Sequence, residues 1–159
     1  MDREELFLSE FEYNNDKMYL ILRGHLYIES ELIKLIENYI LYPEKLELKN
    51  MGFNNKCRMA SSLGLIDDQM FEILILINRL RNKYAHNLEY NITKGEIDKL
   101  EHKISTFEGF EFIREKVIIG EKAGLPEDIK VCILSVRSIL QLSRKSVQKK
   151  IPEFIWPRE

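Results

Sequence analysis

One segment of the chain combines residue types that could act on a phosphate. The sequence "RLRNKYAHN", residues 79–87, follows the strongly apolar run "MFEILILI". An imidazole such as His86 can move a proton to or from the 2′-hydroxyl of RNA. A guanidinium such as Arg81 can hold a phosphate through two parallel hydrogen bonds, and this reaction needs no metal ion. The segment is either an ordinary polar helix end or a site, and as a site its chemistry suits RNA cleavage with Arg81 and His86 as the reacting groups.

The spacing of these residues limits how one helix can present them. Asn82 and His86 lie four residues apart, so the amide can stack beneath the imidazole and orient it. Arg81 and His86 lie five residues apart, which places them about 140° apart on an ideal helix. One copy therefore does not aim both groups at a single atom unless the helix frays after Ala85. Two copies could supply them jointly, which predicts a homodimer.

Two further residues of the segment are assigned supporting roles. Tyr84 continues the apolar stripe of Ile73, Ile77 and Leu80 and is expected to pack against the body of the protein. Lys83 belongs to the same polar cluster and is taken as a supporting residue of the site.

A second group of polar residues interrupts the apolar face of an earlier helix. That face is expected to be buried, in two rows: Leu22, Leu26, Ile33, Ile36 and Ile40, and Ile21, Ile28, Leu32, Leu35 and Tyr39. His25 and Glu29 occupy slots in these rows and lie one turn apart, so they can contact each other. They are either a satisfied interior pair or part of a cleft beside residues 79–87. Gly24 predicts the close approach of another helix, and Arg23 is expected to face away from His25.

The elements that must position these residues are all predicted to be helices, about five or six in a single domain that covers residues 1–159. No segment shows the alternation of a strand. The first helix should begin at Asp16 and end before Pro43, and a short second helix should be capped by Asn54 or Asn55 and end at Gly64. Asp67 and Asp68 should open the next helix, and Thr93 with Glu96 forms a capping-box pattern for a fourth helix that runs to about Lys103. The segment "FEGFEFIREKVII" is predicted to be helical, and Pro126 should start the last helix, which runs to about Lys150. Residues 1–15 and 151–159 are predicted terminal arms, with Phe154 and Trp156 packed on the body.

Composition narrows the classes of function. Charged residues make up 31% of the 159 residues, and the net charge of −2 gives no overall attraction to nucleic acid, although a local basic groove is compatible with it. The N-terminus lacks the apolar segment of a signal peptide, and no apolar run approaches the roughly 18 residues of a membrane span, so a cytoplasmic protein without membrane contact is expected. Cys57 and Cys132 have no metal-ligand spacing and are expected to be reduced, partly buried thiols. Neither a metal nor another cofactor is predicted.

"RNKYAH" at the end of an apolar helix resembles the R-x4-6-H motif of the HEPN domain family. The resemblance covers this motif and the helical layout of about residues 15–145. It implies a helical bundle that dimerises so that paired motifs form a metal-independent endoribonuclease site. On that pattern Arg81, Asn82 and His86 are the site residues. The resemblance also implies a toxin or an antiviral-defence effector, with an antitoxin or a regulatory protein as a possible partner.

The chain also resembles a second family. "LRGHLYIESELIKLI", followed later by "RLRNKYAHN", is similar to the mannitol-operon repressor family of small helical regulators. This resemblance implies a non-catalytic transcriptional regulator or interaction module, in which the same residues are structural. A basic surface around the motif would favour the nuclease. A motif sealed inside the subunit, with Arg81 paired to Glu29 and no groove, would favour the regulator.

Overall fold

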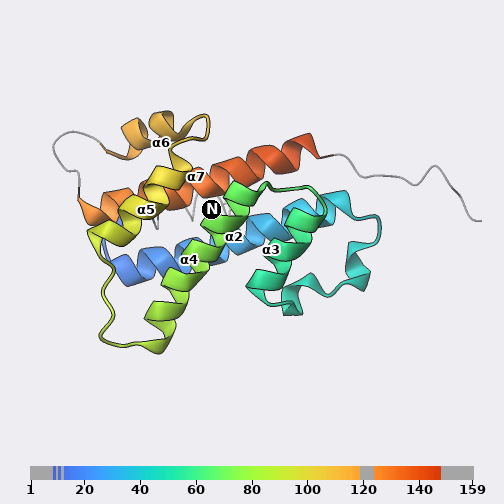
Figure 1. Cartoon of the computed structure of the whole chain (residues 1–159), viewed down its shortest axis with the longest axis horizontal. Coiled ribbons are helices and arrows are strands. Elements are labelled where there is room, and N and C mark those ends of the chain that lie inside the picture. The colour runs from blue at the N-terminus through green and yellow to red at the C-terminus, as the bar shows by residue number, and fades with distance from the viewer. Residues whose placement is uncertain (1–8, 10, 12, 119–123, 148–159) are drawn as a thin grey trace, which may run out of the picture.

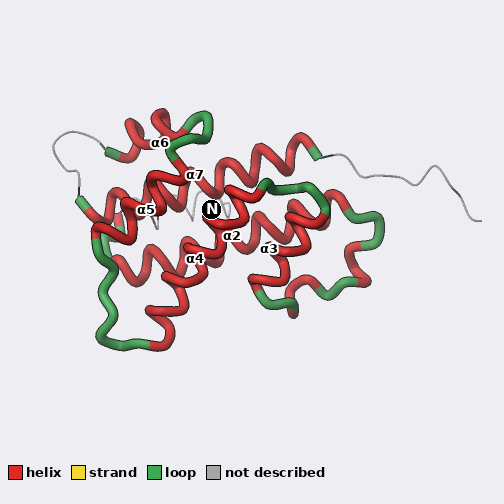
Figure 2. The backbone as a smooth tube through the Cα atoms, viewed as in Figure 1, coloured by secondary structure: helices red, strands yellow, loops and turns green. Residues whose placement is uncertain are grey.

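The computed structural model describes residues 9, 11, 13–118 and 124–147, and every regular element in these ranges is helical (Figure 2). The prediction of an all-α helical bundle is therefore confirmed. The elements are α2 (Lys17–Tyr39), two short 3-10 helices (Pro43–Lys45 and Leu48–Asn50), α3 (Phe53–Ser62), α4 (Asp68–His86), α5 (Lys94–Ile104), α6 (Phe110–Val117) and α7 (Leu125–Ser146). The predicted packing of Phe154 and Trp156 falls outside the described residues.

Most helix starts follow the capping residues predicted from the sequence. The carboxylate of Asp16 accepts a hydrogen bond from the backbone N–H of Tyr19 at 2.6 Å and begins α2. Asp67 caps α4 in the same way. Thr93 and Glu96 form the predicted capping box at the start of α5. These caps are local, because each side chain bonds a backbone group within three residues of itself, and so they are readable without tertiary structure.

Two of the predicted helix boundaries were wrong, one at a start and one at an end. The N-cap of α3 is Gly52, so Asn54 and Asn55 lie in the first turn and their side chains do not cap it. The last helix ends at Ser146 with Val147 as its C-cap, before the predicted end near Lys150. The first of these corrections matters for the site, since it leaves two asparagine amides available for other contacts.

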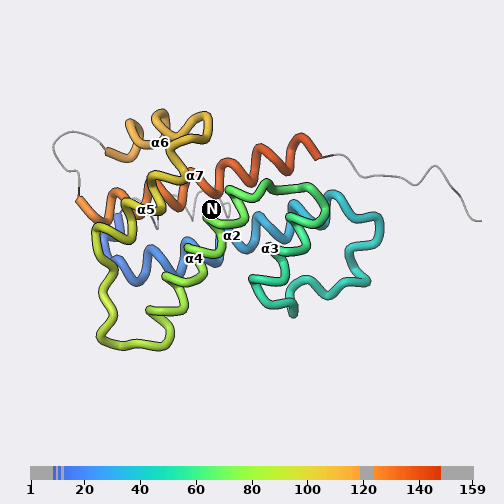
Figure 3. The backbone as a smooth tube through the Cα atoms, viewed as in Figure 1, coloured from blue at the N-terminus to red at the C-terminus, as the bar shows by residue number. Residues whose placement is uncertain are grey.

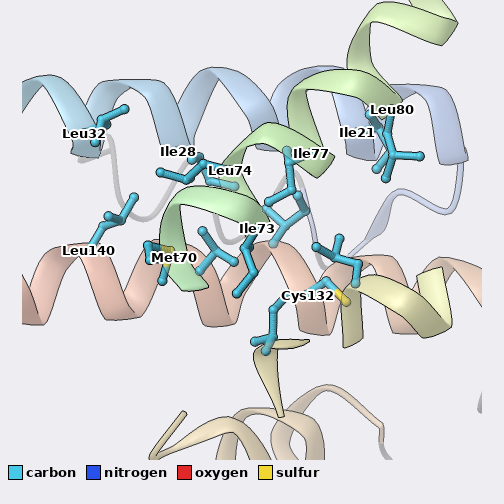
Figure 4. Close-up of a cluster of buried hydrophobic side chains, with 14 of the residues drawn as sticks. Ile21, Ile28, Leu32, Met70, Ile73, Leu74, Ile77, Leu80, Cys132 and Leu140 are labelled. Atoms are coloured by element: carbon cyan, nitrogen blue, oxygen red, sulfur yellow. The ribbon is translucent and has the colours of Figure 1, made fainter. Parts of the chain in front are cut away.

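The two longest helices, α2 and α7, run side by side, and α4 crosses them (Figure 1). Gly24 marks a close approach of the two helices: a Cβ atom there would lie only 2.8 Å from Cγ2 of Ile133 in α7. The predicted close approach of a second helix at Gly24 is confirmed. Side chains of α2, α4 and α7 meet in one apolar core, which includes Ile28, Leu74 and Leu140 (Figure 4).

The buried face of α2 is narrower than the sequence predicted. Ile21, Ile28, Leu32, Leu35 and Ile36 are fully buried. In the other predicted row Leu26 is 52% exposed, and Leu22, Ile33 and Ile40 are only partly buried. The two rows are therefore not equally buried within the chain: in the row that includes Leu26, only Ile36 is fully buried. An apolar row is left at the surface of α2.

The two cysteines are free thiols inside the core. Cys57 and Cys132 are both buried, as part of the apolar cluster. Burial raises the pKa of the Cys57 thiol to about 12, and it also raises the pKa of Cys132. Both are therefore protonated at neutral pH and act as small apolar side chains.

Candidate functional site

An open cavity of about 360 Å³ lies where α2, the start of α3 and the second half of α4 meet. It is lined by His25, Glu29, Met51, Gly52, Phe53, Asn54, Asn55, Asn78, Arg81 and Asn82. Four of the predicted site residues therefore meet in one place: His25, Glu29, Arg81 and Asn82. The volume lies within the range of about 300–1,000 Å³ that is common for small-ligand sites.

Arg81 faces this cavity with its charge available. One of its terminal nitrogens donates a hydrogen bond to Oδ1 of Asn82 at 3.0 Å. Within the described part of the chain, no carboxylate forms an ion pair with Arg81. Asn82 therefore holds the guanidinium, where the sequence predicted that it would hold the imidazole of His86. A guanidinium held in this way keeps other N–H groups for a phosphate or a carboxylate.

His25 is buried beside the cavity, with only 4% of its surface exposed. Nε2 of His25 lies 3.1 Å from Oδ1 of Asn78, whose amide nitrogen donates to Oδ1 of Asn54 at 2.9 Å. The second bond turns the oxygen of Asn78 toward His25, so Nε2 must be the protonated nitrogen that donates to it. Nδ1 of His25 is then an acceptor, and it has no hydrogen-bond partner among the described residues.

The environment keeps His25 neutral. Burial lowers its pKa below the ordinary value; the Glu29 carboxylate opposes this shift, and the positive charge of Arg81 adds to it. The imidazole ring packs against Phe53, with the ring centroids 4.3 Å apart. A neutral, sterically held imidazole presents a lone pair on Nδ1 and no positive charge.

Glu29 does not pair with the residues that the sequence suggested. Its Oε1 accepts a hydrogen bond from Nζ of Lys56 at 2.6 Å, and the Lys56 side chain is only 2% exposed. His25 and Glu29 lie on one face of α2, as expected, but each bonds a partner from a different helix. Glu29 therefore pairs with Lys56 and not with Arg81.

His86 lies apart from the cavity. It is the last residue of α4, it is exposed, and it does not line the cavity that contains Arg81. The helix stays regular through Ala85, so it does not fray in the way that would bring His86 toward Arg81. Within one subunit, Arg81 and Asn82 therefore meet His25, and His86 is presented outward. The separation of Arg81 from His86 agrees with the angle expected from their spacing.

Lys83 and Tyr84 hold the loop that follows α4, which forms the lower left edge of the molecule in Figure 3. Nζ of Lys83 lies 2.6 Å from Oε1 of Glu96. Tyr84 is 8% exposed, and its hydroxyl accepts a hydrogen bond from the backbone N–H of Ile92 at 3.1 Å. The prediction that Tyr84 packs against the body is confirmed. Both side chains act on the end of α4, away from the cavity.

Glu96 connects this loop to the motif helix. Besides Lys83, it accepts hydrogen bonds from the hydroxyl of Tyr90 and from the backbone and hydroxyl of Thr93, each at 3.0 Å. Burial alone would raise the pKa of Glu96, but these hydrogen bonds, with the largest contribution from Lys83, lower it to about 2. An ionised Glu96 therefore ties α5 to the end of α4.

Several lining residues were missed from the sequence, and some left a signal there. Asn78 is a polar residue at the end of an apolar run, three residues before Arg81 and so on nearly the same side of α4. Lys56 falls in the buried row of α3, between Phe53 and Ala60, where a charged residue needs a partner. Asn54 and Asn55 were read as helix caps. Nothing in the sequence alone indicated that these segments converge.

Neither a metal site nor a membrane span is visible in the described ranges. Across residues 9, 11, 13–118 and 124–147, no three His, Cys, Asp or Glu side chains are grouped so that they could hold a metal ion. In the same residues no helix has the length and apolar character needed to cross a membrane. Comparisons with family models, with curated proteins and with solved structures found no match to this chain.

Proposed function

We propose that this chain is a metal-independent endoribonuclease of the HEPN type. The observation that carries the proposal is the state of Arg81, which lines an open cavity and has no carboxylate partner among the described residues. A structural arginine is expected to be neutralised by an acid, as Lys56 is by Glu29. A regulator would be favoured by a sealed motif in which Arg81 pairs with Glu29. Here Arg81 lines an open cavity, and Glu29 pairs with Lys56.

In the proposed reaction Arg81 binds the scissile phosphate of RNA. A base removes the proton of the 2′-hydroxyl, the 2′-oxygen bonds to phosphorus, and the bond from phosphorus to the 5′-oxygen breaks. The leaving oxygen takes up a proton, so the products are a 2′,3′-cyclic phosphate and a 5′-hydroxyl. Arg81 stabilises the charge that builds on the phosphate, and Asn82 holds the guanidinium in place. His86 supplies the proton transfer.

The outward position of His86 favours a site shared between two copies. Arg81 and His86 of one subunit do not face the same cavity, so a second copy is needed to bring an imidazole to the phosphate. The apolar row on the surface of α2 supports such an assembly. Met18 and Leu26 in this row are 47% and 52% exposed, and Leu26 lies one turn before Glu29, which lines the cavity.

The test is cleavage of structured and unstructured RNA by purified protein, with and without EDTA. Arg81→Ala and His86→Ala should each reduce the rate by about 10²-fold or more, the scale of losing a charge clamp or a general acid–base group. Asn82→Ala should reduce the rate of cleavage less, because Asn82 only holds the guanidinium. The matched controls are Arg79→Ala and His102→Ala, which remove an exposed arginine and histidine outside the cavity and should cleave like the wild type.

Three results would contradict the proposal. Equal cleavage by the wild type, Arg81→Ala and His86→Ala would indicate a contaminating nuclease. Cleavage only after Mg²⁺ is added would overturn the mechanism. Absence of cleavage on every RNA would favour the regulator, with these residues in structural roles.

A further inference from the structure

An apolar groove of about 320 Å³ lies between α6 and the second half of α7, on elements that do not line the Arg81 cavity (Figure 1). Its lining includes Phe112 and Ile113 of α6 and Ile139 and Leu142 of α7. Phe112 is 64% exposed and Leu142 is 63% exposed, although both are large apolar side chains. Apolar side chains from two helices that face one groove form a docking surface, in contrast to single apolar residues scattered over a surface.

The helix on one side of this groove is held by few buried side chains. α6 has eight residues, and Phe110 is the one that is buried. Its main neighbour is α7, and Arg114 adds an ion pair of 3.1 Å to Glu101 of α5. A helix of this length is marginal without packing against other elements, so an occupant of the groove would stabilise the position of α6.

The chain itself supplies an occupant of matching chemistry. α7 lines the groove and ends at Ser146, and after Val147 the sequence continues as "QKKIPEFIWPRE", residues 148–159. The two prolines of this sequence disfavour a helix at the residues that precede them. In an extended chain Phe154 and Trp156 point to the same side, because side chains alternate with a period of two. The segment therefore offers two aromatic rings on one face.

The groove is within reach of this segment. From Val147 back to Ser138, α7 covers about 14 Å at its rise of about 1.5 Å per residue. Trp156 follows Val147 by nine residues, which span up to about 30 Å when extended. The segment can therefore reverse its direction after α7 and lie along the groove. Lys145, which lines the groove near the end of α7, offers a positive charge to Glu153.

We propose that residues 151–157 dock in the groove between α6 and α7 of the same chain, with Phe154 and Trp156 packed on Phe112 and Leu142. Docking removes the two rings and the two exposed side chains from water together. The polar side chains of Ser138 and Gln141, which also line the groove, can bond the backbone of the extended segment. The segment holds α6 against α7, and this docking is independent of the nuclease function.

Fluorescence of the full-length chain tests the proposal, because Trp156 is its single tryptophan. The emission of the folded protein should be blue-shifted relative to the protein in urea, and acrylamide should quench it less. Phe112→Glu and Leu142→Glu should each lose the blue shift and the protection, since they place a charge in the apolar groove. Both residues are exposed, so the helical content measured by circular dichroism should stay unchanged. Leu88→Glu, in the exposed loop after α4, is the matched control and should keep the wild-type emission.

Hydrogen exchange gives a second measurement that does not depend on fluorescence. Trp156→Ala should increase the rate of amide exchange in α6, because the docked segment no longer holds that helix, and should leave exchange in α5 unchanged. Equal exchange of α6 in the wild type and in Trp156→Ala would overturn the proposal.

The fluorescence outcomes also identify the chain that occupies the groove. A blue shift that persists in Leu26→Glu and on dilution supports docking within one chain. A blue shift that is lost on dilution would show that the segment docks on a second copy, and would overturn docking within the chain. Emission equal to that of the unfolded protein, or a blue shift that both groove variants retain, would overturn the docking site, whatever the result with RNA.

Discussion

At the scale of single residues, the ion pair between Glu29 and Lys56 determines the character of the candidate site. The two partners are unequally buried: the Glu29 side chain is 22% exposed and that of Lys56 is 2% exposed. Removing Lys56 and removing Glu29 therefore have different consequences. An unpaired Glu29 can still reach water, whereas an unpaired Lys56 is left as a buried charge.

We expect Glu29→Ala to lower the free energy of unfolding by about 2 kcal/mol or more, because it leaves the ammonium group of Lys56 buried without a counter-charge. Lys56→Met should cost less, since methionine fills a similar volume without a charge. The double variant should have nearly the same free energy of unfolding as Lys56→Met. Urea denaturation of the three variants at neutral pH measures these differences. If Glu29→Ala unfolds at the wild-type midpoint, the pair contributes nothing and the buried position of Lys56 is wrong.

At the scale of elements, the end of α4 depends on α5 and the loop between them. Lys83, Tyr90 and Thr93 all bond Glu96, and Tyr84 bonds the backbone of Ile92. These contacts fix the last turn of α4, which carries His86. The geometry of the proposed proton-transfer group therefore depends on a carboxylate ten residues further along the chain.

The lowered pKa of Glu96 predicts how the stability conferred by this carboxylate changes with pH. In the unfolded chain Glu96 binds a proton near its ordinary value of 4.5, whereas in the folded protein it stays ionised down to about pH 2. The stabilisation is therefore complete above pH 4.5 and is lost as pH falls toward 2. We expect Glu96→Gln to be less stable than the wild type at pH 7, and the difference to shrink between pH 4.5 and 2.

Denaturant midpoints at several pH values measure this difference. Glu89→Gln, which changes an exposed carboxylate in the same loop, is the control and should follow the wild type. A difference between Glu96→Gln and the wild type that stays constant down to pH 2 would show that the ionised carboxylate is not the source of the stabilisation.

At the scale of the whole molecule, the apolar residues exposed on α2 are the feature that bears on assembly. Met18 and Leu26 are exposed, and Leu22 is only partly buried between them. Their spacing of four residues places them in one row along the helix. Burial of this row against a second copy would remove apolar surface from water and bring the two cavities toward the same interface.

Light scattering at micromolar concentration should therefore give about twice the chain mass of 18.9 kDa. Leu26→Glu should shift the protein toward the monomer and reduce RNA cleavage with it, without loss of helical content, since Leu26 is 52% exposed within the subunit. Leu142→Glu changes a leucine of α7 that is 63% exposed and should leave the dimer intact. A monomeric wild type that cleaves RNA would contradict a shared site.

The sequence by itself determined the helices and much of their packing faces. Asp16, Asp67 and the Thr93–Glu96 box could be read directly, because a cap bonds backbone groups within a few residues of itself. Gly24 predicted a helix crossing, because only a residue without a side chain permits that approach. The separation of Arg81 from His86 followed from the helical repeat alone.

Only the tertiary structure decided which polar groups meet. The partner of Glu29 lies 27 residues away on α3, and the partner of His25 lies 53 residues away on α4. Such pairs depend on how the helices cross, which a local pattern does not specify. The same crossing decided that one apolar row of α2 is largely buried and the other only partly, since hydrophobic spacing shows that a face is apolar but not what covers it. The cavity that Arg81 and four asparagines line exists because three segments distant in the sequence meet there.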